Sequence, residues 1–515
     1  MLKKLRVALA WIFWVGITLL FLDFTGTLHA YLGWMAKVQF LPAVLALNVG
    51  VIVALVLLTL VCGRVYCSVI CPLGVFQDGI SWLRAHRSKK PFIYRKGMKA
   101  LRYGVWALFV IALVAGVHVF VTLLAPYSAY GHMVQNLLQP IYIWGNNLLA
   151  GFAEQAGSYA FYDKEVWLRS LPTFIVALVT LIVVGFLAFK GGRTYCNDVC
   201  PVGTTLSFLS RFAMFRPVID HDKCKHCRAC ELHCKAQCID IGKDHEMIDY
   251  SRCVDCFNCL EQCKFGALEY KYAWSATKNA KNVALEPENT VSATNNAENV
   301  ALEEKEPKSR RAFMTGTALA VAAAALKGVE ARAQEAAKKT DGGFADVLPK
   351  QAPKRVTPVT PPGSKSVKSF YQHCTACQLC EAECPNDVLR PSGRLDYLMQ
   401  PEMSFEKGFC RPECTRCAEL CPTGAIQKIT KEEKTQYHVG TAGVNVDLCL
   451  EATGKSPCCK CAEVCPTGAI AMVQQGETRR PAVAEEICIG CGKCEYLCPV
   501  RPISAITVNG KGHHI

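Results

Sequence analysis

The stretch Cys224–Cys234, with the sequence CKHCRACELHC, has the cysteine spacing C-x2-C-x2-C-x3-C, and Cys253–Cys263, with the sequence CVDCFNCLEQC, repeats it. In this spacing a tight loop brings three thiolates to three corners of one iron–sulfur cubane, and the fourth cysteine reaches the neighbouring cubane. Residues 216–272 are therefore predicted to form a two-cluster unit. The predicted ligand sets are Cys224, Cys227, Cys230 and Cys263 for one cluster and Cys253, Cys256, Cys259 and Cys234 for the other.

A structural zinc site is the rival interpretation of these cysteines. Zinc sites use two thiolate pairs separated by a longer loop, whereas four closely spaced thiols that are then repeated favour cubanes. Lysine follows both fourth cysteines where proline is usual, at Lys235 and Lys264, and Cys238 is left without a role. The lysines affect the local turn more than the ligation, so the cubane prediction stands.

Residues 369–515 contain four more motifs of this kind, each with a proline after its fourth cysteine. The second motif begins with C-x3-C and the third with C-x8-C, so their binding loops are enlarged. The fourth cysteines could be exchanged between adjacent motifs or between outer and inner pairs, and the spacing leaves both open. Six 4Fe-4S clusters are predicted in all, and the further iron ligands are Cys374, Cys377, Cys380, Cys384, Cys410, Cys414, Cys417, Cys421, Cys449, Cys458, Cys461, Cys465, Cys488, Cys491, Cys494 and Cys498.

The composition excludes several other classes of protein. The chain has 515 residues, 51% of them hydrophobic, and 31 cysteines, but disulfide-dense domains are small and lack long apolar segments. The formal net charge of +14 accompanies no recognised nucleic-acid module, so no nucleic-acid partner is predicted. The sequence has neither C-x-x-C-H for covalent haem nor G-x-G-x-x-G for a dinucleotide.

Residues 1–215 are predicted to be a membrane domain of four helices. Basic residues are frequent between Arg84 and Arg102, where no acid occurs, and the positive-inside rule places this loop in the cytoplasm. Pro126–Ser170 is then outside. The first span is interpreted as a signal anchor because no cleavage site follows it. The four predicted spans are Val7–Leu22, Phe40–Val61, Tyr103–Pro126 and Leu171–Phe189.

Two features of this domain could bind a quinone substrate. His118 lies inside the third span, where burying an ionisable group is costly, and it is a weak candidate for a catalytic quinone ligand. Aromatic residues of the second outer loop could line a quinone pocket, but an interfacial aromatic belt is favoured. They are Tyr127, Tyr130, Tyr142, Trp144, Tyr162 and Trp167.

A second cysteine pattern follows the second and fourth spans. GRVYCSVICPLG, residues 63–74, recurs as GRTYCNDVCPVG, residues 192–203. On a helix, C-x3-C places both thiols on one face, so four thiols from two pseudo-symmetric hairpins could converge at the cytoplasmic surface. They could bind a further metal or cluster, form a redox-active dithiol or be buried thiols only, and a redox role is favoured. The four thiols belong to Cys67, Cys71, Cys196 and Cys200.

The middle of the chain is predicted to export the last domain. Residues 273–308 are polar and repetitive, which indicates a flexible linker. Residues 309–333 contain a twin arginine, a short apolar run and Ala331-Arg332-Ala333, which together predict a Tat-type signal or anchor, with cleavage after Ala333 left open. A short buried helix is the alternative. Residues 334–368 form a second linker, and domain 369–515 is predicted to be periplasmic.

These motifs resemble those of a known pair of proteins. Residues 1–272 resemble the NapH membrane ferredoxin in their four spans, two C-x3-C-P motifs and two cubane motifs. The part from Ser309 onward resembles the NapG ferredoxin of the MauM/NapG family in its Tat signal and four cubane motifs. The resemblance implies a NapH–NapG fusion in a bacterial inner membrane, with an α-helical membrane domain and α+β ferredoxin-like 4Fe-4S modules.

The resemblance also implies a function, that of a quinol dehydrogenase component rather than a terminal catalyst. Electrons would pass from the membrane quinone pool to a periplasmic reductase of nitrate-reductase type or to a cytochrome c acceptor. The related MauM and MauN proteins leave open an electron-donating maturation or reactivation factor for a periplasmic metalloenzyme. A purely structural anchor is disfavoured, because one or two clusters would suffice for folding. The predicted topology separates two clusters from four by about 30 Å of hydrocarbon, and the sequence does not identify the route between them.

Overall fold

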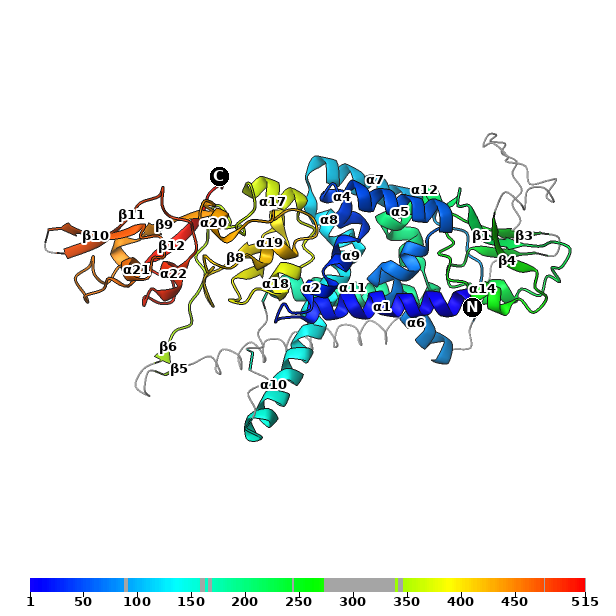
Figure 1. Ribbon diagram of the computed structural model, residues 1–515, viewed down its shortest axis with the longest axis horizontal. Coiled ribbons are helices and arrows are strands. Elements are labelled where there is room, and N and C mark those ends of the chain that lie inside the picture. The colour runs from blue at the N-terminus through cyan, green and yellow to red at the C-terminus, as the bar shows by residue number, and fades with distance from the viewer. Residues whose placement is uncertain are drawn as a thin grey trace, which may run out of the picture.

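The computed structural model describes residues 1–87, 91–157, 163–164, 169–242, 245–272, 339–340, 346–476 and 478–514. The predicted linker and the predicted Tat segment, residues 273–333, lie outside these ranges. Figure 1 shows an elongated molecule with a helical core in the middle. The domain of residues 216–272 lies at one end of the core, beside the N-terminus, and the C-terminal domain lies at the other.

Helices form almost all of the core, and among the described residues two helices, α1 and α11, are long and apolar enough to cross a membrane. Each has 21 residues, or about 31 Å at 1.5 Å per residue, which matches the hydrocarbon thickness. The elements are α1 (Leu2–Leu22), α2 (His29–Leu32), α3 (Trp34–Lys37), α4 (Phe40–Leu45), α5 (Val49–Cys62), η1 (Tyr66–Ile70), α6 (Pro72–Arg87), α7 (Lys99–Ala115), α8 (His118–Leu124), α9 (Pro126–Met133), η2 (Val134–Leu138), α10 (Gln139–Gln155), α11 (Leu171–Gly191), η3 (Tyr195–Val199) and α12 (Pro201–Ser210).

The second and third predicted spans are not continuous helices, which corrects the sequence prediction. In the second, α4 ends at Leu45 and α5 starts again at Val49, because the side chain of Asn48 caps the new helix by accepting a hydrogen bond from the N–H of Val51 (3.3 Å). In the third, Gly116 adopts the left-handed conformation (φ 76°) and ends α7 before α8 begins. Both breaks rest on single residues inside otherwise apolar runs.

The start of the predicted second outer loop is buried inside the core. Every residue of α9 is buried, and α9 packs against α6 and α11, so α8 and α9 form a hairpin that enters the helical core. Tyr127 and Tyr130 of α9 therefore do not belong to a surface aromatic belt. Tyr142 and Trp144 are exposed on α10, which projects from the core (Figure 1). Tyr162 and Trp167 lie outside the described residues.

The domain at the N-terminal end is a small two-sheet unit in which each short helix follows a cysteine loop. Lys3 of α1 forms an ion pair with Glu261 of this domain (2.6 Å), which places the start of α1 beside it. The elements are β1 (Phe215–Ile219), α13 (Ala229–Leu232), β2 (Ile239–Ile241), β3 (Glu246–Ile248), α14 (Asn258–Gln262) and β4 (Leu268–Tyr272), with antiparallel pairs β1–β4 and β2–β3.

The C-terminal domain docks against the opposite end of the core, where α18 packs on α1 and η4 packs on α8. The described strands of this domain form two-stranded antiparallel sheets, β7–β8, β9–β12 and β10–β11, and β5–β6 is a further pair in the segment before it. The elements are β5 (Lys339–Thr340), β6 (Asp346–Val347), α17 (Val367–His373), α18 (Leu379–Ala382), β7 (Leu389–Pro391), η4 (Leu395–Tyr397), β8 (Pro401–Met403), α19 (Arg416–Leu420), α20 (Lys431–Lys434), β9 (Gly440–Val444), η5 (Val446–Leu448), α21 (Lys460–Glu463), β10 (Ile470–Gln475), β11 (Thr478–Val483), α22 (Lys493–Leu497) and β12 (Ile506–Gly510).

Candidate iron–sulfur and thiol sites

The cysteines of the N-terminal unit surround two separate cavities. One cavity is lined by the first three cysteines of the first motif and the fourth of the second. The other is lined by the reverse combination together with Cys238, whose Sγ lies 3.6 Å from that of Cys234. The exchange of fourth cysteines that the sequence predicts is therefore the arrangement in the structure. The sets are Cys224, Cys227, Cys230 and Cys263, and Cys234, Cys253, Cys256 and Cys259.

In the C-terminal domain the fourth cysteines are exchanged between adjacent motifs, which resolves the alternative that the spacing left open. Two sets line cavities of their own. The remaining cysteines make up the other two sets, and thiols within each of these lie in electrostatic range of one another. The first pair of sets is Cys374, Cys377, Cys380 and Cys421, with Cys410, Cys414, Cys417 and Cys384. The second pair is Cys449, Cys458, Cys461 and Cys498, with Cys488, Cys491, Cys494 and Cys465.

Four of the six binding loops share one backbone shape. The residues just before and just after the second cysteine adopt positive φ, as at His226 (49°) and Arg228 (60°). Gly490 and Gly492 occupy the same two positions in the last motif, where glycine adopts this conformation without steric cost. The enlarged second and third loops lack this shape, since Thr415 (φ −115°) and Cys459 (φ −126°) have ordinary φ. Two loop geometries can thus present thiols to a cubane.

The two C-terminal pairs of sets are in direct contact. The backbone N–H of Cys410 donates a hydrogen bond to the carbonyl oxygen of Cys491 (2.9 Å). The set of Cys374 faces the helical core, where His132 of α9 forms a hydrogen bond through Nε2 with the carbonyl oxygen of Ala376 (2.6 Å). The four C-terminal sets therefore follow one another from the core to the far end of the domain.

Two lysines, the buried Lys434 and the half-buried Lys350, lie against the cysteine loops of this domain. Lys434 donates hydrogen bonds from Nζ to the Sγ of Cys410 (3.2 Å) and to the carbonyl oxygen of Cys414 (2.5 Å). Lys350 donates to the carbonyl oxygens of Tyr496 (2.5 Å) and Cys498 (3.2 Å), and burial lowers the pKa of Lys350 to about 8. Both lysines place positive charge beside thiolates.

Replacing Lys434 with methionine is expected to lower the reduction potential of a cluster held by Cys410. A hydrogen bond and a positive charge at a thiolate favour the reduced cluster, which carries one more negative charge. Lys431 lies on the same helix but is exposed, so Lys431→Met is the matched control. A redox titration followed by EPR of both variants measures the shift. Equal potentials in the two variants would contradict the predicted role of Lys434.

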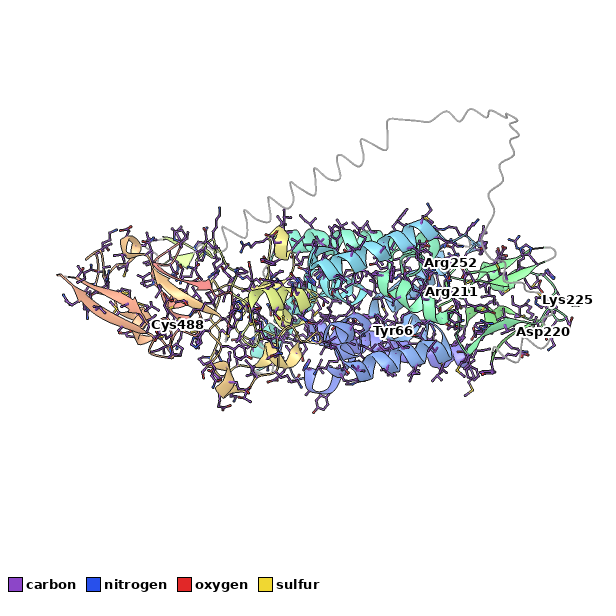
Figure 2. All side chains as sticks on the ribbon, turned by 90° about the horizontal axis from the view of Figure 1, so that it is seen from above. Tyr66, Arg211, Asp220, Lys225, Arg252 and Cys488 are labelled. Atoms are coloured by element: carbon purple, nitrogen blue, oxygen red, sulfur yellow. The ribbon has the colours of Figure 1, made fainter. Side chains whose placement is uncertain are left out.

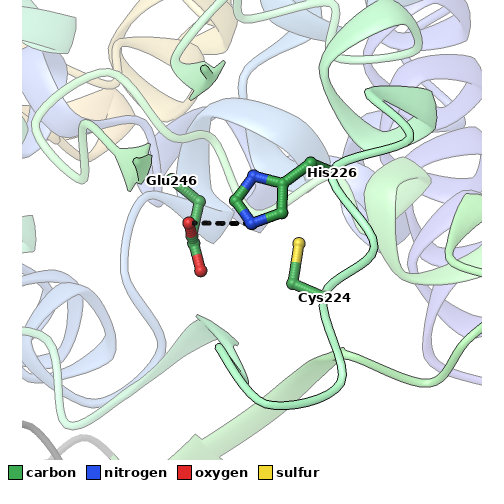
Figure 3. Close-up of side chains that lie close together, drawn as sticks. All are labelled: Cys224, His226 and Glu246. Carbon is green, nitrogen blue, oxygen red and sulfur yellow. Dashed lines mark ion pairs between the residues drawn. The ribbon is translucent and has the colours of Figure 1, made fainter. Parts of the chain in front are cut away.

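The donor atoms of Cys224, His226 and Glu246 lie within 4.8 Å of one another (Figure 3). His226 Nε2 and an oxygen of Glu246 are 3.7 Å apart. Such a trio could hold a metal ion, but Cys224 also lines the cavity with Cys227, Cys230 and Cys263. Four thiols in the spacing of a cubane motif fit an iron–sulfur cluster better than this mixed set of three.

The two C-x3-C-P motifs converge inside the helical core. A π-helical turn, η1 or η3, joins the two cysteines of each motif, and the four thiols are buried and close enough to interact electrostatically. Figure 2 shows Tyr66, which precedes the first thiol, midway along the molecule between Lys225 at one end and Cys488 towards the other. The predicted convergence of four thiols is present, but the thiols are buried in the helical core rather than lying at a surface. Only the first cysteine of each motif lies in the π-helical turn, and the second cysteine follows it directly.

The arginine of each motif crosses to the other motif. Arg64 donates from Nη2 to the carbonyl oxygen of Cys196 (3.1 Å), and Arg193 donates from Nη1 to that of Cys67 (2.7 Å). Both arginines are fully buried. The final glycine of each motif leaves room for the crossing, because a Cβ at Gly74 would lie 2.6 Å from Nη1 of Arg193. The repeated pattern G-R-x-Y-C-x3-C-P-x-G is thus one pseudo-symmetric unit.

The N-terminal cluster unit, residues 216–272, packs against the first glycine of each motif. A Cβ at Gly63 would overlap the carboxylate of Asp255, and a Cβ at Gly192 would overlap the carbonyl oxygen of Lys235. The backbone N–H of Arg64 donates to Asp255 (2.8 Å), and burial raises the pKa of this aspartate to about 7. The thiol site therefore lies directly beneath the cluster unit.

His118 does not join the thiol site. It is buried at the start of α8, within electrostatic range of His373, and so lies beside the C-terminal domain. Four residues that the sequence did not single out lie closer to the cysteines than His118 does. They are the two crossing arginines, Asp78, which binds one of them, and His132 on the Ala376 loop. The repeated Gly-Arg before each Tyr-Cys is the signal that could have identified the arginines.

Comparisons with known proteins agree with these sites. A family model described as a 4Fe-4S binding domain matches residues 44–91 and 171–218, which contain the two C-x3-C-P motifs. A model described as a 4Fe-4S dicluster domain matches residues 456–501. No solved structure matches the chain. Fold and sites thus define an iron–sulfur, ferredoxin-type protein suited to electron transfer.

Individual relatives show which ferredoxin-type proteins the chain is similar to. The chain is 29% identical to an uncharacterized protein of Methanocaldococcus jannaschii, over 50% of this chain and 82% of the relative. It is 29% identical to the ferredoxin-type protein NapF of Escherichia coli, over 32% of this chain and 96% of NapF. It is 23% identical to the ferredoxin-type protein NapH of the same organism, over 46% and 71%. These similarities support a Nap-like ferredoxin, and the fusion of NapH with NapG stays a prediction.

Proposed function

We propose that this chain carries electrons from membrane quinol to a periplasmic reductase of nitrate-reductase type. The observation that carries the proposal is the order of the six cysteine sets along the long axis of the molecule. Two sets lie at one end of the helical core, and four follow one another at the other. The similarity to NapH and NapF supports a redox partner of the Nap type.

The cysteines of the six sets would each hold one cubane as iron ligands. When bound, a 4Fe-4S cluster accepts and releases single electrons, so a series of them can divide the two electrons of a quinol. The protein's own contribution is to fix the order of the sets and to adjust potentials, as Lys434 and Lys350 do with hydrogen bonds and charge. The proposed membrane topology has the N-terminal unit in the cytoplasm and the C-terminal domain in the periplasm.

The positions of basic residues support this topology. The loop predicted to be cytoplasmic lies against the N-terminal unit, where the N–H of Phe92 donates to the carbonyl oxygen of Leu232 (3.0 Å). Arg95 of that loop also forms an ion pair with Asp198, which lies within the second thiol motif. Residues 309–333 are proposed to export the C-terminal domain as a Tat signal.

Anaerobic EPR of the full chain after addition of a menaquinol or ubiquinol analogue tests the proposal. Reduced-cluster signals should appear with the quinol and not with the matching quinone. If quinol leaves every cluster oxidised while dithionite reduces them, the quinol dehydrogenase function is wrong. The electron-donating maturation factor would then be the better description.

A further inference from the structure

We propose that the four thiols of Cys67, Cys71, Cys196 and Cys200 bind one shared cubane, a seventh cluster, which links the N-terminal unit to the C-terminal domain through the α8–α9 hairpin. The relay role rests on the proposed function, whereas the metal site does not. Both repeats contribute two thiols each, so neither motif makes a site alone.

The charge around the thiols indicates a bound anionic centre. The guanidinium of Arg64 is fully buried, and its hydrogen bonds go to Asn197 (2.8 Å), to two carbonyl oxygens and to the Sγ of Cys67 (3.8 Å). No carboxylate among the described residues accepts a hydrogen bond from this guanidinium. Asp255 lies within electrostatic range of Arg64, but it accepts a hydrogen bond from the backbone N–H of Arg64 and not from the guanidinium. A buried guanidinium without a hydrogen-bonded carboxylate is unfavourable. Thiolates within electrostatic range supply an anion.

The second arginine, Arg193, also lacks a carboxylate of its own. Arg193 donates from Nε to Asp78 (2.7 Å), but Asp78 is shared with Arg6 (2.6 Å) and Lys235 (3.0 Å). One carboxylate thus faces three cations. Within the described part of the chain, Nη2 of Arg193 and Nε of Arg64 are buried and lack a hydrogen-bond partner. These N–H groups can donate to the sulfurs of a cluster.

A cubane matches this charge. Four thiolates on an oxidised cubane carry about two negative charges in all, which the two crossing guanidiniums offset. A zinc ion with four thiolates would carry the same charge, so the charge alone does not select iron. The match of a 4Fe-4S binding domain to the two segments that hold these cysteines favours the cubane.

The position of the site connects the two ends of the molecule. Towards the N-terminal unit, Lys235 follows Cys234 of one set and binds Asp78 beside Arg193. Towards the C-terminal domain, Tyr195 donates from its hydroxyl to the carbonyl oxygen of Leu124, at the turn of the α8–α9 hairpin (3.4 Å). From that turn α9 runs eight residues to the His132 contact with the Ala376 loop, or about 12 Å.

This geometry shortens the path for electrons between the two end domains, which the sequence left unexplained. A gap of about 30 Å of hydrocarbon becomes two shorter steps, and buried Tyr127 of α9 lies within electrostatic range of Cys377 at the end of the second step. Each step moves one electron: the cluster that gives it is oxidised, the shared site is reduced and then reoxidised, and the next cluster is reduced. No bond forms or breaks, and quinol is the ultimate reductant.

Metal analysis of the full chain tests the site. The double variant Cys67→Ala/Cys196→Ala should fall from about 28 to about 24 irons per chain, while Cys62→Ala, just outside the motif, should retain the wild-type iron. EPR signals of the other six clusters show that the variant folds. Cys200→Ser provides a second variant. Unchanged iron, or zinc lost in place of iron, would overturn the seventh cluster.

Quinol reduction of the same variants tests the relay. In wild-type protein, quinol should reduce clusters in both end domains, whereas in the double variant it should reduce those of one end only. A variant that loses about four irons and still reduces both ends at the wild-type rate overturns the relay. If quinol reduces nothing even in wild type, the proposed function fails, and the iron loss still decides the metal site.

Discussion

The Cys384→Ala variant is expected to lose the cluster of Cys410, Cys414 and Cys417, although Cys384 belongs to the sequence motif of Cys374. In the structure Cys384 lines the cavity of that second motif. Removing one of four thiolate ligands should cost the protein about four irons and leave the other clusters in place. Iron analysis and EPR of the purified chain measure the loss.

Double variants make this assignment decisive. If Cys384 and Cys410 hold the same cluster, the Cys384→Ala/Cys410→Ala variant loses no more iron than either single variant, about four per chain. Cys384→Ala combined with Cys377→Ala removes ligands of two clusters and should lose about eight. A loss of about eight irons from the Cys384/Cys410 pair would contradict the exchange between adjacent motifs.

The pairing of the first eight cysteines was predictable from the sequence, whereas that of the last sixteen was not. Two adjacent motifs with ordinary spacing leave one simple exchange. Four motifs leave several, and two have enlarged loops at Cys410 and Cys449. What selects the arrangement is contact between separate segments of the chain, such as the hydrogen bond from Nδ2 of Asn386, near Cys384, to the carbonyl oxygen of Phe409, next to Cys410 (3.1 Å). Spacing along the chain carries no information about such contacts.

The helical core was also predictable from the sequence only in part. Hydropathy identified α1 and α11, because long apolar runs without capping residues form continuous helices. It did not separate α4 from α5 or α7 from α8, because the breaks depend on Asn48 and Gly116 inside apolar runs. The aromatic belt favoured for Tyr127 and Tyr130 was wrong, because burial of these tyrosines is decided by the packing of α9 against α6 and α11.

The crossing of Arg64 and Arg193 was not predictable from the sequence. The repeat of Gly-Arg-x-Tyr-Cys indicated pseudo-symmetry, but the same pattern is compatible with arginines that face lipid headgroups. Only the three-dimensional arrangement shows that each arginine binds the backbone of the opposite motif. The same contacts make the basic residues part of a buried network rather than a signal of topology alone.

That network predicts a large loss of stability for the Asp78→Asn variant. The Asp78 carboxylate joins three parts of the molecule: Arg6 of α1 (2.6 Å), Arg193 of the second thiol motif (2.7 Å) and Lys235 of the N-terminal cluster unit (3.0 Å). Removing its charge leaves three buried cations without their shared anion. Loss of one partner from a buried ion pair typically costs about 3–5 kcal/mol.

Glu261→Gln is the matched control, because Glu261 joins α1 to the same cluster unit through an exposed pair with Lys3 (2.6 Å). An exposed pair contributes at most about 1 kcal/mol, so this variant should unfold close to the wild type. Chemical denaturation in detergent, followed by loss of cluster absorbance, compares the two. Limited proteolysis should also release the N-terminal cluster unit from Asp78→Asn first, since Lys235 then loses its anchor on the core. Equal unfolding midpoints for both variants would show that the thiol site and the cluster unit are held together by packing, with the buried charges contributing little.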